Sequence, residues 1–174
     1  MKTLTTTFIL MVLGFIAHEF GHAAMAKLLG YEVEISINHV RTVGGGAPSV
    51  ADRLLIDFAG PAVTLILAGS AAILARVGGF LVAFWVVFTS AHQRIVAQAV
   101  SFSNPNDEMR MSMILDIGAW TVPAAMVGLF LVLTIWAARE ARPGLARLFL
   151  AFIGGSIGIT AVVFGEPYLP SIVW

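Results

Sequence analysis

Apolar residues dominate five long stretches of the chain, and few charged side chains interrupt them. A helix that crosses a lipid bilayer needs roughly 20 mostly apolar residues, so each stretch is long enough to span one. The pattern predicts an all-α membrane protein, a bundle of about five transmembrane helices in a single membrane-embedded domain over residues 1–174. The predicted spans are residues 8–29, 54–75, 78–102, 119–138 and 145–165.

The connection between the first two apolar stretches, residues 30–53, has a different pattern. Val33, Ile35 and Ile37 alternate with polar residues, which is typical of a half-buried strand. Because unpaired backbone near lipid is costly, we expect this strand to pair with a neighbour such as residues 40–43, or to lie in a wet cleft. The following three glycines predict a turn. The sequence thus predicts a small strand or hairpin insertion after the first helix.

Composition supports the membrane assignment and narrows the chemistry. The chain is 59% hydrophobic and 11% charged, with Lys+Arg 10 balancing Asp+Glu 10, whereas soluble domains carry about 25% charged residues. Zero net charge and the lack of a basic cluster argue against a nucleic-acid partner. Because the chain has no cysteine, thiolate metal sites are excluded, and a metal would need His, Asp or Glu.

The first apolar stretch carries three ionisable residues in an H-E-x-x-H sequence, His18-Glu19-Phe20-Gly21-His22. The two histidines are one helical turn apart, so their imidazoles can converge on one ion. Glu19 beside them can act as a general base toward a zinc-bound water. Burying these groups unpaired would cost several kcal/mol, which favours a metal over simple hydrogen bonding. One Zn²⁺ per chain fits best, since it accepts imidazole and carboxylate.

Two histidines leave a catalytic zinc one protein ligand short. Counting spans places the polar interval 103–113 on the same face of the bundle as the histidines, so Asp107 is the first candidate. The Asn-Pro-Asn before it should break the helix and redirect the backbone inward. Asp116 is the alternative ligand, and Glu108 and Asp57 are further competitors.

Two other sets of polar residues could serve the same site. Arg94, Gln98 and Ser101 follow a 4-then-3 spacing, and such a stripe should face the bundle interior or a cavity. There it could stabilise an oxyanion or line a water path. Alternatively, the third span ends near Ala91 and these residues lie in the membrane interface. Asn104 could position a substrate carbonyl.

Together these residues resemble the site-2 protease family of intramembrane zinc metalloproteases. The resemblance covers residues 8–116 and implies that 119–138 and 145–165 are additional helices. The H-E-x-x-H inside an apolar helix is its specific part. The other features that carry it are the strand-like segment, Ala59-Gly60-Pro61 and the Pro-x-Asp of Pro105–Asp107.

The resemblance implies a role for each matching residue. His18, His22 and Asp107 would be the zinc ligands, and Glu19 would be the base. The strand of residues 31–38 would be an edge that holds an unwound substrate, and we expect Val33, Ile35 and Ile37 to flank that docking site.

The chain also departs from the family pattern. The family's Asn after Ala-Gly-Pro is replaced by Ala62-Val63-Thr64, and the Leu-Asp-Gly ending of the Asp motif is missing. A Leu-Asp pair persists at Asp116, which keeps that residue in competition with Asp107. No PDZ domain fits in 174 residues, so the chain resembles the family's short members.

We therefore expect a zinc-dependent intramembrane endopeptidase that hydrolyses transmembrane or membrane-associated substrates. Its partners would be a membrane-protein substrate and the lipid bilayer, and the resemblance implies an active site near the cytoplasmic face. The alternative is a non-catalytic membrane protein that binds metal or transmembrane helices, either transport-like or an inactive protease homologue.

Overall fold

The computed structural model describes residues 1–44 and 46–174, and it is a helical bundle with a small sheet at one end. Gly45, in the predicted glycine turn, lies outside the described residues. The helices of the described part are α1 (Lys2–Leu28), α2 (Val50–Gly78), α3 (Leu81–Val100), α4 (Asp107–Ile114), α5 (Thr121–Ala141), α6 (Leu145–Gly165) and the 3₁₀ turn η1 (Glu166–Tyr168). The strands are β1 (Glu32–Ile35), β2 (Val40–Val43) and β3 (Ile172–Val173).

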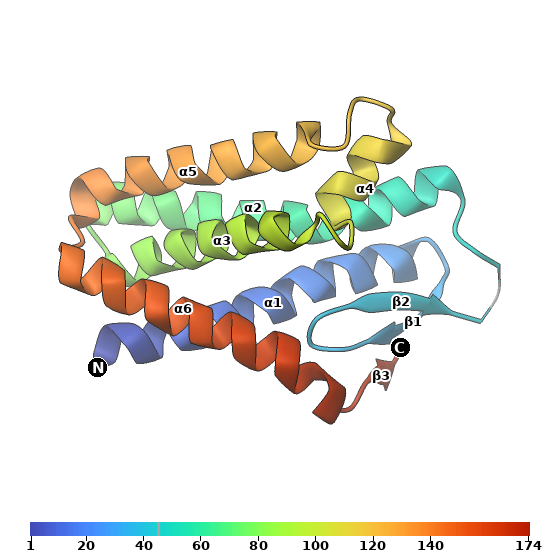
Figure 1. Ribbon diagram of the computed structural model, residues 1–174, viewed down its shortest axis with the longest axis horizontal. Coiled ribbons are helices and arrows are strands. Elements are labelled where there is room, and N and C mark those ends of the chain that lie inside the picture. Colours follow the sequence, from blue (N-terminus) through green and yellow to red (C-terminus); the bar gives the residue numbers. More distant parts are fainter. Residues whose placement is uncertain (45) are drawn as a thin grey trace.

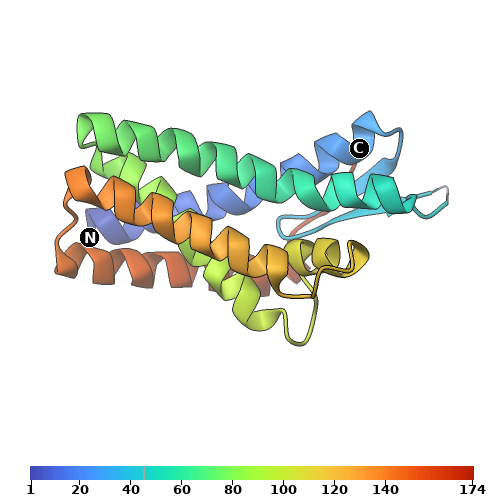
Figure 2. The same ribbon diagram turned by 90° about the horizontal axis from the view of Figure 1, so that it is seen from above.

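The long helices run side by side along the longest axis of the molecule, and α1 packs against α2, α3 and α6 (Figures 1 and 2). The sheet and the short helix α4 lie together at the end opposite the N-terminus. Within the described residues, four helices are long and apolar enough to cross a membrane, namely α1, α2, α5 and α6. The structure thus agrees with a helical membrane protein.

The predicted third span forms α3 but is not among those four helices. Its second half carries His92, Gln93 and Arg94, all buried, and these polar side chains lower its hydropathy. The helix nevertheless continues to Val100. Arg94, Gln98 and Ser101 are all buried, as expected for a polar stripe that faces the interior of the bundle.

Close contact between α6 and α1 fixes the helix that carries the histidines. A Cβ at Gly158 of α6 would lie 2.8 Å from Met11 Cβ of α1, so only glycine allows the backbones to approach this closely. Helix α6 begins and ends where the sequence predicts, at Leu145 and Gly165.

The sheet has the order β2-β1-β3, and both pairings are antiparallel. The predicted hairpin is confirmed, with Val33 opposite Thr42 and Ile35 opposite Val40. The prediction that the first strand is an edge is wrong, because β3 from the far end of the described chain pairs with its other side. Ile37 lies in the turn between β1 and β2, outside the strand.

Candidate metal centre

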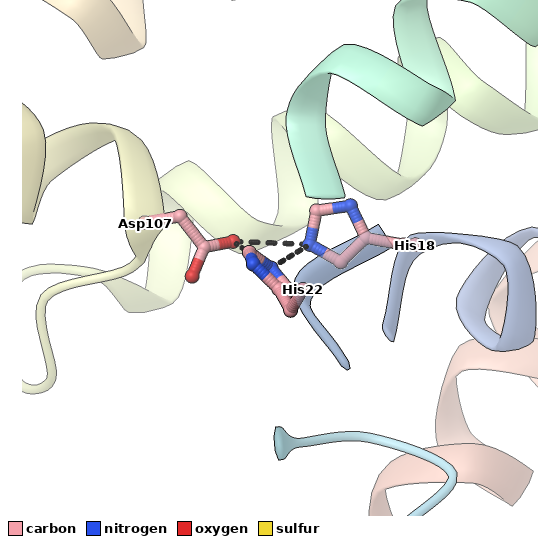
Figure 3. A group of neighbouring side chains, drawn as sticks. All are labelled: His18, His22 and Asp107. Carbon is pink, nitrogen blue, oxygen red and sulfur yellow. Dashed lines mark hydrogen bonds and ion pairs between the residues drawn. The ribbon is translucent and has the colours of Figure 1, made fainter. Parts of the chain in front are cut away.

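Two imidazoles of α1 and one carboxylate of α4 converge in the interior of the bundle (Figure 3). The Nε2 atoms of His18 and His22 are 3.1 Å apart, and Asp107 Oδ2 lies 3.0 Å from the first and 3.3 Å from the second. His18 and His22 are 3% and 6% exposed. The structure therefore brings together the three residues that the sequence proposed as metal ligands.

The partners of the other ring nitrogens assign the tautomer of each histidine. His22 Nδ1 lies 2.6 Å from the carbonyl oxygen of Ile56, which can only accept, so Nδ1 carries the proton. Thr64 donates its hydroxyl proton to Gly60 O and accepts from His18 Nδ1 at 3.0 Å. In each ring Nε2 is therefore unprotonated, and its lone pair faces the other Nε2 atom and Asp107 Oδ2.

His18 Nε2, His22 Nε2 and Asp107 Oδ2 are thus three hydrogen-bond acceptors that face one another, and none of them carries a proton to donate. Lone pairs and a carboxylate oxygen at these separations repel unless a cation lies among them. Imidazole nitrogens and a carboxylate oxygen are donors that zinc accepts. The geometry and the donor set both fit a divalent metal ion, although they are not specific to zinc.

Glycine at position 60 makes room for His22. A Cβ built on Gly60 would overlap the His22 ring at Nε2. At the residue before His22 on α1, a Cβ on Gly21 would lie 2.7 Å from the carbonyl oxygen of Ala59. The Ala59-Gly60-Pro61 sequence therefore has a steric role, because it lets α2 approach the histidine face of α1.

The second oxygen of Asp107 is held by Arg110. Arg110 Nη2 lies 2.5 Å from Asp107 Oδ1, and the same guanidinium binds Asp57, with Nη2 2.7 Å from Oδ1. Burial opposes the charge on Arg110, but hydrogen bonds to Asp57 and the nearby carboxylates outweigh it and raise the pKa of Arg110 above its usual value. The bond to Arg110 leaves Oδ2 free to face the histidines.

The start of α4 determines which acidic residue reaches the histidines. Asn106 caps the helix by accepting from the backbone N–H of Met109 at 3.0 Å, as the predicted helix break requires. Asp107 is therefore the first residue of α4, and its side chain enters the site. Asp116 lies exposed in the turn after α4, with a φ of 52°.

The other acidic competitors have different partners. Asp57 is bound to Arg110, as above, and Glu108 pairs with Arg94 of α3, Nη1 to Oε1, at 3.0 Å. Neither belongs to the group of convergent ligand atoms. Of the four carboxylates considered from the sequence, only Asp107 joins the histidines in the described part of the chain.

The buried and partly buried charges around the histidines do not balance. When ionised, four carboxylates oppose two guanidinium groups, which gives a formal charge of −2 that one divalent cation would neutralise. The groups are Glu19, Asp57, Asp107 and Glu108 against Arg94 and Arg110.

A cavity of about 1060 Å³ opens beside the ligand group. His18, His22, Asp107 and Glu19 line this cavity. Glu19 is buried, with 7% of the residue exposed, and its carboxylate has no hydrogen-bond partner among the described residues. Asn104 lines the same cavity from the loop before α4. Glu19 is thus available to a water molecule in the cavity.

The open edge of the sheet faces this cavity. Val33 exchanges both backbone hydrogen bonds with Trp174, at 3.1 and 2.8 Å, so its polar groups point away from β2. In an antiparallel ladder the residue opposite such a position also points away. Thr42, and by the same alternation Val40, therefore direct N–H and C=O to the free side of β2, where both residues line the cavity.

Three supporting features were not predicted from the sequence. Arg110 was given no role, Thr64 was noted only as part of a departure from a motif, and β3 was not predicted. A local signal existed for Arg110 alone, since it follows Asp107 by three residues in a short helix. Comparison with protein-family models, with curated proteins and with solved structures finds no match to this chain.

Proposed function

We propose that the chain is a zinc-dependent intramembrane endopeptidase. The observation that carries this proposal is the convergence of three acceptor atoms, His18 Nε2, His22 Nε2 and Asp107 Oδ2. Beside them lies the buried carboxylate of Glu19, which has no hydrogen-bond partner in the part of the chain that the structure describes. A helix that merely hydrogen-bonded its neighbours would pair donors with acceptors. This group instead leaves a place for a cation and a base next to it.

His18, His22 and Asp107 would hold the zinc ion in this proposal. When bound, zinc supplies a Lewis acid that lowers the pKa of a coordinated water to about 7 and polarises a carbonyl group. Thr64 and the Ile56 carbonyl would hold the two rings in the tautomer that binds metal, and Arg110 would orient Asp107. Each ligand therefore has a supporting partner in the fold.

Glu19 would act as the general base and then as the general acid. Its carboxylate takes a proton from water as the water oxygen bonds to the peptide carbonyl carbon. When the C–N bond breaks, Glu19 returns that proton to the leaving nitrogen. The burial of Glu19 beside the ligands, with no competing hydrogen bond among the described residues, supports this role.

The free edge of β2 would hold the substrate in an extended form. A peptide bond within a helix is shielded because its backbone groups are already hydrogen-bonded, so cleavage requires local unwinding. The outward N–H and C=O groups of Val40 and Thr42 could pair with an unwound strand. This placement replaces the docking site expected at Val33, Ile35 and Ile37, because β1 is paired on both sides.

Cleavage of a model transmembrane peptide by detergent-purified, zinc-loaded protein tests the proposal. We expect wild type to cut the peptide and Glu19→Gln to bind zinc but leave the peptide intact. Glu19 lines the cavity without holding another residue, so this variant should fold normally. If Glu19→Gln cleaves as fast as wild type, or if neither protein cleaves any membrane peptide while zinc is bound, the enzyme assignment is wrong.

A further inference from the structure

The second half of α3 carries buried polar side chains that line the cavity of the candidate metal centre. Some of their polar atoms have no hydrogen-bond partner among the described residues. Arg94 is 3% exposed, and its one hydrogen bond among the described residues runs from Nη1 to Glu108 Oε1. Among the described residues, the donors Arg94 Nε and Gln93 Nε2 have no partner, and neither has the acceptor Glu108 Oε2. Buried donors without acceptors are costly. A ligand that brings an acceptor oxygen would satisfy the two donors.

Arg94 is open to the cavity through which such a ligand would enter. It lines the same cavity as His18 and Glu19. The other arginine that pairs with buried carboxylates, Arg110, already donates to Asp57, Asp107 and the carbonyl oxygen of Pro105. Each guanidinium nitrogen of Arg110 donates a hydrogen bond, whereas Arg94 Nε donates none among the described residues.

The first turn of α4 links Arg94 to the metal ligands. Asp107 and Glu108 are neighbours in sequence, and one joins the histidines while the other holds Arg94. Glu108 is fully buried, so the pair is shielded from water, and its geometry is fixed by the same helix start that places the ligand. The guanidinium is therefore held in a constant position relative to the metal centre.

We propose that Arg94 is a catalytic residue that binds the carbonyl oxygen of the scissile peptide, with Glu108 as its positioning residue. This role rests on the proposed function. As the water oxygen bonds to the carbonyl carbon, the π pair of the C=O bond moves onto the carbonyl oxygen and the water proton goes to Glu19. Arg94 donates hydrogen bonds to that negative oxygen. The charge then returns as the C–N bond breaks and Glu19 protonates the nitrogen.

Arginine is suited to this position because it stays protonated even when buried and offers five N–H donors in a planar fork. A donor aimed at a developing oxyanion in a dry site is worth about 100- to 1000-fold in kcat. The positively charged guanidinium of Arg94 stabilises the neutral carbonyl of the bound substrate less than it stabilises the oxyanion. Loss of Arg94 should therefore lower kcat much more than it raises KM.

The test compares wild type with the double variant Arg94→Met/Glu108→Leu and with Arg94→Lys. A single neutral substitution would leave Glu108 buried and unpaired, whereas removing both charges avoids that cost. Zinc content and melting temperature are measured first, then kcat and KM. A second readout is the affinity of a phosphinic peptide, a tetrahedral anion that mimics the oxyanion, for each zinc-loaded protein.

We expect the double variant to retain zinc, with kcat lowered about 100- to 1000-fold, phosphinic-peptide affinity lowered by a comparable factor and KM little changed. Arg94→Lys keeps a charge for Glu108 but loses the planar fork, so its kcat should lie between the other two. Should the double variant not fold, Arg94→Lys with wild-type kcat and phosphinic-peptide affinity would overturn the role.

Two outcomes separate this inference from the proposed function. If wild type cleaves and the double variant cleaves equally well, Arg94 and Glu108 form a structural ion pair, and the peptidase assignment stands. If zinc-loaded wild type cleaves nothing, the peptidase assignment fails and the role of Arg94 fails with it.

Discussion

His18 Nε2 and Asp107 Oδ2 lie 3.0 Å apart although 89 positions separate them in the chain. The two residues belong to α1 and to the first turn of α4, and their contact is made inside the bundle rather than at its surface. Since both atoms are acceptors once the Thr64 contact fixes the His18 ring, a cation between them is the simplest account of their proximity.

Thr64→Val should weaken zinc binding while leaving the fold intact. The change removes the acceptor for His18 Nδ1 but keeps the shape of the side chain. Supporting hydrogen bonds of this kind typically contribute about 10- to 100-fold in metal affinity. Competition with a zinc chelator measures the effect. Thr89→Val, another buried threonine that bonds only to its own helix, is the matched control, and equal zinc affinity in the two variants would contradict the assigned role.

Gly60→Ala should abolish the metal centre through steric overlap with His22. The added Cβ would meet the imidazole at Nε2, so the ring must turn away from the ligand position. Gly69→Ala in the same helix is the control, because no atom lies within 4 Å of its Cβ position. In a helix interior that change should stabilise the protein by about 0.5–1 kcal/mol. Zinc content and thermal unfolding of both variants test the prediction, which fails if Gly60→Ala retains stoichiometric zinc.

Thr42→Pro should impair substrate binding more than folding or zinc binding. Proline removes the N–H that Thr42 directs to the cavity, whereas the bonds to β1 are made by its neighbours. We expect KM for a transmembrane peptide to rise with little change in zinc content. Thr42→Ala, which keeps the backbone N–H at this position, serves as the control. Unchanged KM in Thr42→Pro would show that the edge of β2 does not hold substrate.

Acid should release β3 from the sheet. Hydrogen bonds from Ser171 and Arg41 hold the pKa of Glu34 below its usual value, so Glu34 stabilises the sheet above about pH 4.3, the usual pKa of a free Glu. That contribution is lost as the pH falls through the lowered pKa. The indole NMR signal of Trp174, which stacks on Phe20 at 6.0 Å, reports the release.

Glu34→Gln removes the titrating group and is the control for this acid transition. Its Trp174 signal should differ from that of wild type already at neutral pH and should show no further change in mild acid. An identical acid transition in wild type and Glu34→Gln would mean that another group controls the release.

Local patterns predicted the helices and the hairpin because each depends on nearby residues. The apolar stretch 145–165 became α6 with the same bounds, and the alternation around Val33 became β1. The third span was predicted from its length and apolar residues, whereas the buried polar side chains of α3 give this helix a lower hydropathy than the four candidate spans. The pattern of apolar residues therefore predicts that a segment is helical more reliably than it predicts that the helix crosses a membrane.

Long-range pairing was beyond what spacing could reveal. Nothing near Ile172 indicates that it pairs with Ile35, so the sequence made β1 an edge when it is the central strand. The choice between Asp107 and Asp116 was open for the same reason. It depends on the Asn106 cap and on Arg110 reaching Asp57 in another helix, contacts that arise only when the helices pack.

Zinc content of detergent-purified protein, measured by mass spectrometry for wild type, Asp107→Ala and Asp116→Ala, tests the metal centre most directly. We expect about one zinc per chain in wild type and in Asp116→Ala, and clearly substoichiometric zinc in Asp107→Ala. Wild-type protein that takes up no zinc, or equal zinc in all three proteins, would contradict the assignment of His18, His22 and Asp107 as a metal site.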